Sequence, residues 1–269
     1  MRKPTDICLL CQAAPADKTN SHILPRFIST NFLQEPGKGR RGYEIGADQV
    51  QGRKAKVIQD SPKENYILCS SCESFLSIIE GLAADTFKNW RFHLTNGDFS
   101  EKKILPPHLS LINCGINNAL PSRILIYSMF WRASISSHPL FDGYNLNKQL
   151  QESLRTSILS IKGENRAEVI EKINTIKVIL HPYTALTSFN FIDSTANSLA
   201  AISDNIPASL NVDEFGFLLF PDIASITPEI ISPLSNIKEL DHYFVVLDKD
   251  LWHSIMVKRL IDEVVTRNK

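Results

Sequence analysis

The chain contains 269 residues, enough for one large domain or two smaller ones with a buried core. Hydrophobic residues make up 43% and charged residues 22%, which is typical of globular proteins and excludes a solvated tail or a fibrous repeat. The 29 lysines and arginines balance the 29 aspartates and glutamates, so the protein is not a polycation and any nucleic-acid contact must be local.

The N-terminal sequence indicates no export or membrane signal. No apolar segment of a signal peptide follows Arg2 and Lys3, and no run approaches the roughly 18 to 20 apolar residues that cross a bilayer. We therefore expect a cytoplasmic protein without a membrane partner. Because cytoplasmic thiols are kept reduced, the closely spaced pairs among the five cysteines are expected to be metal ligands or catalytic residues and not disulfides.

Two motifs of identical spacing, Cys8-Leu9-Leu10-Cys11 and Cys69-Ser70-Ser71-Cys72, have the spacing of zinc knuckles. In such a knuckle a tight turn directs two thiolates toward one tetrahedral ion. We predict a structural zinc ion held by Cys8, Cys11, Cys69 and Cys72; the alternative is two independent pairs of buried thiols. Four thiolates leave no open position, so this zinc would hold the fold and could not activate water.

The segment between the two cysteine pairs is basic. Between residues 36 and 56, six lysines and arginines face only Glu44 and Asp48, and several are flanked by glycine. Flexible cations of this kind can bind nucleic-acid phosphates, although a run of charges can also be ordinary solvated surface. The predicted nucleic-acid-binding residues are Lys38, Arg40, Arg41, Arg53, Lys54 and Lys56.

The second cysteine pair is predicted to stand between a strand and a helix. The run Tyr66-Ile67-Leu68 predicts the strand, and the helix is expected to begin at about Glu73. Glu80 follows almost two turns later and so projects from nearly the same face as Glu73.

These motifs, in this order, resemble the zinc-stapled branch of the HNH nucleases, also called ββα-metal or His-Me finger. Members carry C-x-x-C, an acid-His-hydrophobic-x-Pro segment, an Asn-led strand into a second C-x-x-C, and a helix. The matching residues here are 8–11, 21–25, 65–68 and 69–72, within a region that ends near residue 85.

The resemblance implies a nuclease mechanism. His22 matches the general base, a role that suits an imidazole with an ordinary pKa of about 6.5. Asn65 matches the asparagine that orients this histidine, and a single Mg²⁺ or Mn²⁺ ion would stabilise the charge on the phosphate. The alternative is a structural role, in which His22 caps a turn or donates a hydrogen bond to the zinc site.

Two positions depart from the family pattern. Ser21 stands where an acidic metal ligand is common, and Glu73 stands where the last histidine is common. Glu73 or Glu80 could substitute as a hard oxygen ligand. Alternatively, Glu73 only complements the helix dipole and both acids form the solvated side of the helix, in which case the ion site has been lost.

Downstream of a proposed boundary at residues 92–105, marked by Asn96-Gly97-Asp98 and Pro106-Pro107, the pattern changes to conventional packed structure. Pro121 opens a predicted buried helix, in which Arg132 is expected to be a buried salt-bridge partner and not a substrate clamp. An apolar stripe over residues 146–161 predicts an amphipathic helix. Four strands are predicted at 175–180, 188–192, 215–220 and 242–247, and a closing helix at 251–267.

The sequence therefore predicts an α+β protein: a four-cysteine zinc ββα module at residues 1–92, followed by a helical segment and a small mixed sheet at 105–269. The predicted function is a metal-dependent HNH-type endonuclease acting on DNA or RNA. The alternative is a catalytically inactive zinc module that binds nucleic acid or a protein partner, and a third possibility is a purely structural interaction protein.

Overall fold

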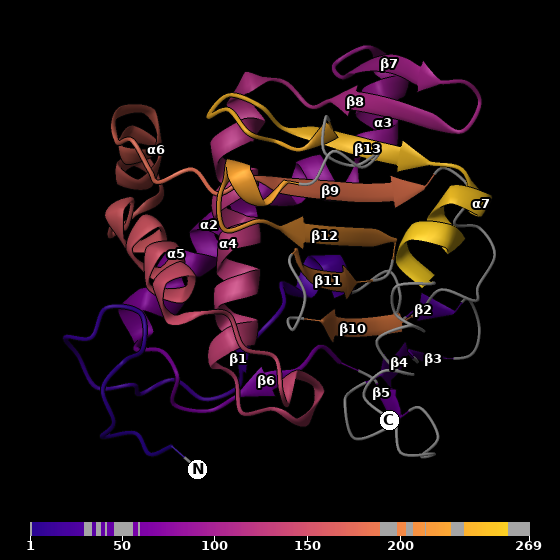
Figure 1. Ribbon diagram of the computed structural model, residues 1–269. Coiled ribbons are helices and arrows are strands. Elements are labelled where there is room, and N and C mark those ends of the chain that lie inside the picture. The colour runs from indigo at the N-terminus through magenta and orange to yellow at the C-terminus, as the bar shows by residue number, and fades with distance from the viewer. Residues whose placement is uncertain are drawn as a thin grey trace.

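In the computed structural model, the described residues are 2–29, 34–35, 39–40, 42–45, 56–58, 60–188, 198–202, 207–212, 214–226 and 234–257. They form a mixed α+β fold in which a long sheet is packed against helices (Figure 1). This confirms the predicted fold class. Two short ribbons lie outside the long sheet: β1 Ser21–His22 with β6 Lys63–Glu64, and β2 Gln34–Glu35 with β3 Gly39–Arg40.

Seven α-helices are found among the described residues. Their bounds are α1 Arg26–Ser29, α2 Ser70–Lys88, α3 Trp90–Asn96, α4 Ala119–Ile135, α5 Lys148–Ser160, α6 Arg166–Thr175 and α7 Lys249–Trp252. The helices predicted at the second cysteine pair, at Pro121 and over the apolar stripe are confirmed as α2, α4 and α5. The predicted closing helix begins earlier, as α7, and continues as a π-helical turn to Val257; residues 258–269 lie outside the described part.

The long sheet has the strand order β5-β4-β10-β11-β12-β9-β13-β8-β7. Its strands are β4 Gly42–Ile45, β5 Lys56–Ile58, β7 Ser100–Leu105, β8 Leu109–Asn113, β9 Tyr183–Ser188, β10 Ser198–Ile202, β11 Ala208–Val212, β12 Phe215–Leu219 and β13 Tyr243–Leu247. Neighbouring strands are antiparallel except for the β4–β10 and β9–β13 pairs, which are parallel. The sheet is therefore mixed, as predicted.

The predicted strands are only partly confirmed. Those at 215–220 and 242–247 correspond to β12 and β13. The strand predicted at 175–180 is wrong, because Thr175 is the last residue of α6 and residues 176–180 form no regular secondary structure. Of the strand predicted at 188–192, only Ser188 is described, as the last residue of β9.

The Pro106-Pro107 pair does interrupt regular structure, but as the turn of a β7–β8 hairpin. The hairpin belongs to the long sheet, since β8 pairs with β13. One cluster of buried residues extends from Cys8 through α2 and α4 to Val246. The division at residues 92–105 stays a prediction about domains, with continuous packing across it.

Helix α4 lies at the centre of this core. Every residue from Ala119 to Ser134 is buried, including the charged Arg123 and Arg132. Arg123 donates to three backbone carbonyl oxygens, those of His181, Asn236 and Lys238, and its guanidinium lies 4.9 Å from the ring centroid of Tyr183. These contacts offset the cost of burying its charge.

His242, on the loop into β13, makes stability depend on pH. Its imidazole is 1% exposed and shares a 2.7 Å hydrogen bond with the Tyr183 hydroxyl. Burial and the nearby Arg123 charge lower its pKa to about 3. In the unfolded chain its pKa is about 6.5, so below that pH the unfolded state binds the extra proton. The free energy of unfolding should fall by up to about 1.4 kcal/mol per pH unit as the pH decreases from about 6.5.

Urea unfolding at about pH 7.5 and about pH 5.5 measures this effect. His242→Gln should lose part of the pH dependence, whereas the same change at the exposed His253 should retain all of it. His22 and His181, whose pKa values are also lowered by burial, contribute with the same sign. An unchanged slope in His242→Gln would contradict the prediction.

None of the helices within the described ranges combines the length and apolar character needed to cross a membrane.

Candidate metal centre and the ribbon beside it

The two predicted knuckles meet. The Sγ atoms of Cys8, Cys11, Cys69 and Cys72 all lie within 4.8 Å of one another, and none forms a disulfide. Cys11 and Cys69 are 3.9 Å apart at sulfur, close to the roughly 3.8 Å edge of a tetrahedron with Zn–S bonds of about 2.3 Å. The cluster could therefore hold a metal ion such as zinc.

The local structure explains why the thiols converge. Gln12 has φ 54° and closes the first knuckle by donating from its N–H to Cys8 O at 3.0 Å. Cys69 is the N-cap residue of α2. With no metal bound, a hydrogen bond from the Cys72 thiol lowers the pKa of Cys8, and the same contact raises the pKa of Cys72, while burial raises the pKa of Cys69.

Side chains outside the cluster hold the two knuckles in place. Asp17 accepts from both Ser70 N, at 2.7 Å, and Ser70 Oγ, at 2.6 Å, and so fixes the start of α2. From α5, Arg155 donates to Leu10 O at 2.6 Å. The metal centre is thus tied to the helical part of the fold.

The strand predicted at Tyr66-Ile67-Leu68 is wrong. Tyr66 has φ 61°, a left-handed conformation that a strand cannot continue. Instead, the backbone around this segment bonds to the first-knuckle chain, with Leu9 N donating to Ile67 O at 2.9 Å and Tyr66 N donating to Lys18 O at 2.7 Å. Two strands and a helix still occur in the expected order, because β1, Ser21–His22, pairs antiparallel with β6, Lys63–Glu64, ahead of α2.

His22 lies on β1. Figure 1 shows this strand near one end of α4. The half-buried imidazole of His22 shares a short hydrogen bond through Nδ1 with Ser61 Oγ, and its carbonyl oxygen accepts from Arg132 Nη1 at 2.7 Å. Burial is the largest cause of a lowered His22 pKa, and the charge of Lys63 acts in the same direction. The imidazole is therefore mainly neutral near pH 7.

Asn65 contacts the backbone of Asn20, two residues before His22, and not the imidazole. Its Oδ1 accepts from Asn20 N at 2.8 Å. The side chain that bonds the imidazole is Ser61, which the sequence reading did not identify. The only local signal was the Asp60-Ser61-Pro62 turn before β6, which gives no hint of a partner 39 residues away.

Both predicted carboxylates are engaged with other side chains. Glu73 accepts from Ser21 Oγ at 2.8 Å. Glu80 pairs at 2.9 Å with Arg132, whose side chain is 2% exposed, which confirms Arg132 as a buried salt-bridge partner. Among the described residues, the four thiols are the one group of three or more His, Cys, Asp or Glu whose ligand atoms converge. The Mg²⁺ or Mn²⁺ site at Glu73 or Glu80 therefore stays a prediction.

Two of the six residues of the basic segment lie on described strands. Arg40 ends β3, Gly39–Arg40, which pairs with β2, Gln34–Glu35, and Lys56 begins β5. Lys38, Arg41, Arg53 and Lys54 lie outside the described residues.

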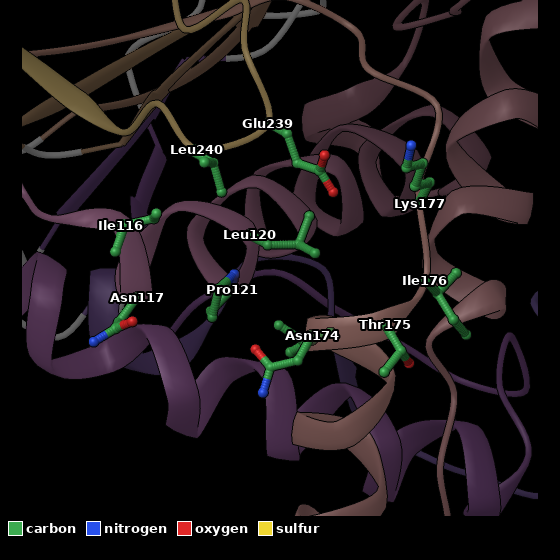
Figure 2. A pocket seen from close by; sticks show the side chains of 11 residues that line it. Ile116, Asn117, Leu120, Pro121, Asn174, Thr175, Ile176, Lys177, Glu239 and Leu240 are labelled. Atoms are coloured by element: carbon green, nitrogen blue, oxygen red, sulfur yellow. The ribbon is translucent and has the colours of Figure 1, made fainter.

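A separate hollow of about 420 Å³ opens where the start of α4 faces the end of α6. Figure 2 shows Leu120 near its centre, with Asn174 on one side and the carboxylate of Glu239 on the other. None of the predicted site residues lines it.

Comparisons with protein-family models, curated proteins and solved structures found no match to this chain. The fold and site thus define a mixed α+β protein with a candidate four-cysteine metal centre. Its likeness to HNH nucleases rests on the residues described above.

Proposed function

We propose that this protein is a zinc-stapled endonuclease of HNH type that cleaves DNA or RNA. The observation that carries the proposal is the half-buried imidazole of His22 on a two-stranded ribbon, directly before a helix whose first turn holds two of the four thiols. The zinc would fix the ends of the segment that carries His22. It would take no part in the reaction, since four thiolates fill its coordination.

In this proposal, His22 is the general base. A neutral imidazole can accept a proton from water at physiological pH, and burial together with Lys63 keeps His22 in that form. Because Nδ1 bonds Ser61, Nε2 is the nitrogen that remains to accept the proton. Asn65 would act through the Asn20 backbone, by holding the ribbon that presents His22.

Activity with Mg²⁺ or Mn²⁺ is a separate part of the proposal, which the resemblance implies. Glu73 and Glu80 each use one carboxylate oxygen in the hydrogen bond to Ser21 or Arg132, which leaves the second oxygen of each carboxylate as a candidate ligand. No step of the proposed reaction is routed through the ion. Its requirement is measured by comparing cleavage with and without added Mg²⁺ or Mn²⁺.

The engagement of both carboxylates favours a second candidate function, a catalytically inactive zinc module that binds nucleic acid or a protein partner. This candidate predicts salt-sensitive nucleic-acid binding without turnover. Neutralising Arg40, Arg41, Arg53 and Lys54 together should weaken that binding. Unchanged affinity would exclude the basic segment as the contact surface.

Replacing His22 by alanine tests the nuclease. We expect wild-type protein to nick supercoiled plasmid and His22→Ala to be slower by about 100-fold or more, the typical contribution of a general base. Zinc content measured by elemental analysis should not change, because His22 is not one of the four converging ligands. His253→Ala, at an exposed position, is the control and should cleave normally. Equal cleavage by His22→Ala and wild type would eliminate His22 as the base.

A further inference from the structure

The β1–β6 ribbon places a lysine directly opposite the proposed base. In its antiparallel register His22 pairs with Lys63. Directly opposed residues of an antiparallel pair project from the same face, with Cβ atoms about 4.5–5.5 Å apart. The charge of Lys63 also reaches the imidazole, since it is the second largest cause of the lowered His22 pKa.

Lys63 is held in this place without being buried. Its Nζ lies 2.5 Å from Asp60 Oδ2, and its side chain is 32% exposed. Asp60 is itself fixed, because its other oxygen accepts from Ser61 N at 2.9 Å. The same short turn thus positions Lys63 through Asp60 and the imidazole of His22 through Ser61.

We infer that Lys63 and His22 together bind one phosphodiester group, with the Lys63 ammonium on a non-bridging oxygen and the His22 imidazole beside the attacking water. An ammonium with three donors can contact a phosphate while keeping Asp60 as a partner. This inference rests on the proposed function and identifies the cation of that site as Lys63. The two acids of the neighbouring helix α2, Glu73 and Glu80, are hydrogen-bonded to Ser21 and Arg132.

The step that this site performs is hydrolysis. The water oxygen forms a new bond to phosphorus while His22 Nε2 takes one of its protons. The bond from phosphorus to the leaving oxygen breaks, and that oxygen keeps the electron pair and takes a proton from solvent. Lys63 stabilises the negative charge that builds on the non-bridging oxygen in the transition state. No electron is transferred, and water is the only co-reactant.

Lys63→Gln tests the inference through two readouts, plasmid nicking and nucleic-acid binding. Binding is measured in the His22→Ala background, so that cleavage cannot interfere, with a fluorescein-labelled DNA duplex and an RNA strand of the same sequence. We expect nicking to fall by about 100-fold, as for loss of one charge-stabilising donor. The slope of log K against log salt should become shallower by about 0.9 for the duplex. Lys63→Arg should retain binding, because the charge is kept.

Lys172→Gln is the matched control. Lys172 is also 32% exposed and also pairs with an acid, Glu168, at 3.0 Å, but it lies on α6. Both readouts should be unchanged in this variant.

The outcomes separate this inference from the proposed function. If His22→Ala abolishes nicking but Lys63→Gln nicks and binds like wild type, the nuclease stands and the Lys63 site is wrong. If neither wild type nor any variant cleaves but Lys63→Gln reduces the salt slope, the phosphodiester-binding site stands and the proposed nuclease activity is wrong. If neither nucleic acid binds to the His22→Ala protein with Lys63 intact, the inference is overturned.

Discussion

Replacing Cys72 with serine is expected to empty the metal centre and to destabilise the N-terminal part of the fold. Cys72 is fully buried in the first turn of α2, among the other three thiols. Zinc binding stabilises only the folded chain, by about 4 kcal/mol when free zinc exceeds its dissociation constant 1,000-fold. We expect zinc to fall from about one ion per chain to a small fraction of that, and the free energy of unfolding to fall by several kcal/mol.

Elemental analysis and urea unfolding measure these two effects. Cys114→Ala is the matched control, because Cys114 is 1% exposed and belongs to the same buried cluster but not to the four-thiol group. It should keep the metal and lose only the packing of one sulfur atom. A chelator should destabilise wild type toward the level of Cys72→Ser and have little effect on that variant. Full zinc content in Cys72→Ser would contradict a four-thiolate site.

The parts of the fold that sequence predicts well are those with local signals. The two knuckles are defined by spacing, and α5 by an apolar stripe that the structure buries at Leu150, Leu154 and Ile158. Strand β7 carries no such signal, since all six of its residues, Ser100–Leu105, are exposed. It becomes a strand by pairing with β8, and β8 is fixed by β13, more than 100 residues later in the sequence. A short stretch of sequence contains no signal for strand pairing over this distance.

The candidate site divides in the same way. Convergence of the cysteines was predictable, because a structural zinc ion takes four ligands and one C-x-x-C knuckle supplies only two. The contacts of His22 were not, since Ser61 and Arg132 are 39 and 110 residues away in sequence. Family resemblance assigned the orienting role to Asn65, and the structure puts its amide oxygen on the Asn20 backbone instead. Which side chain bonds the imidazole is decided by tertiary packing, and the local sequence does not contain that information.

The second large effect is expected at the pair formed by Glu80 and Arg132. Glu80→Leu removes the carboxylate from a guanidinium that is 2% exposed, while Arg132 keeps hydrogen bonds to His22 O and to Ser128. Leaving a buried charge without its partner typically costs about 3–5 kcal/mol. The loss should exceed that of Glu152→Leu in the Arg155–Glu152 pair, where Glu152 is 54% exposed and such a pair contributes at most about 1 kcal/mol.

A double-mutant cycle shows whether the stability lost in Glu80→Leu comes from leaving the Arg132 charge buried without its partner. Glu80→Leu combined with Arg132→Leu removes both charges, so the double variant should be more stable than the sum of the single losses predicts. Arg132→Leu also frees the His22 carbonyl oxygen, so this variant should lose cleavage beyond its loss of stability if the α4 contact positions the proposed base. Urea unfolding measures the losses of stability. Cleavage is measured as plasmid nicking without denaturant, at a temperature well below the midpoint of thermal unfolding. Additive losses across the cycle would mean that the buried pair is not coupled, and the link from α2 through α4 to the ribbon would then be packing alone.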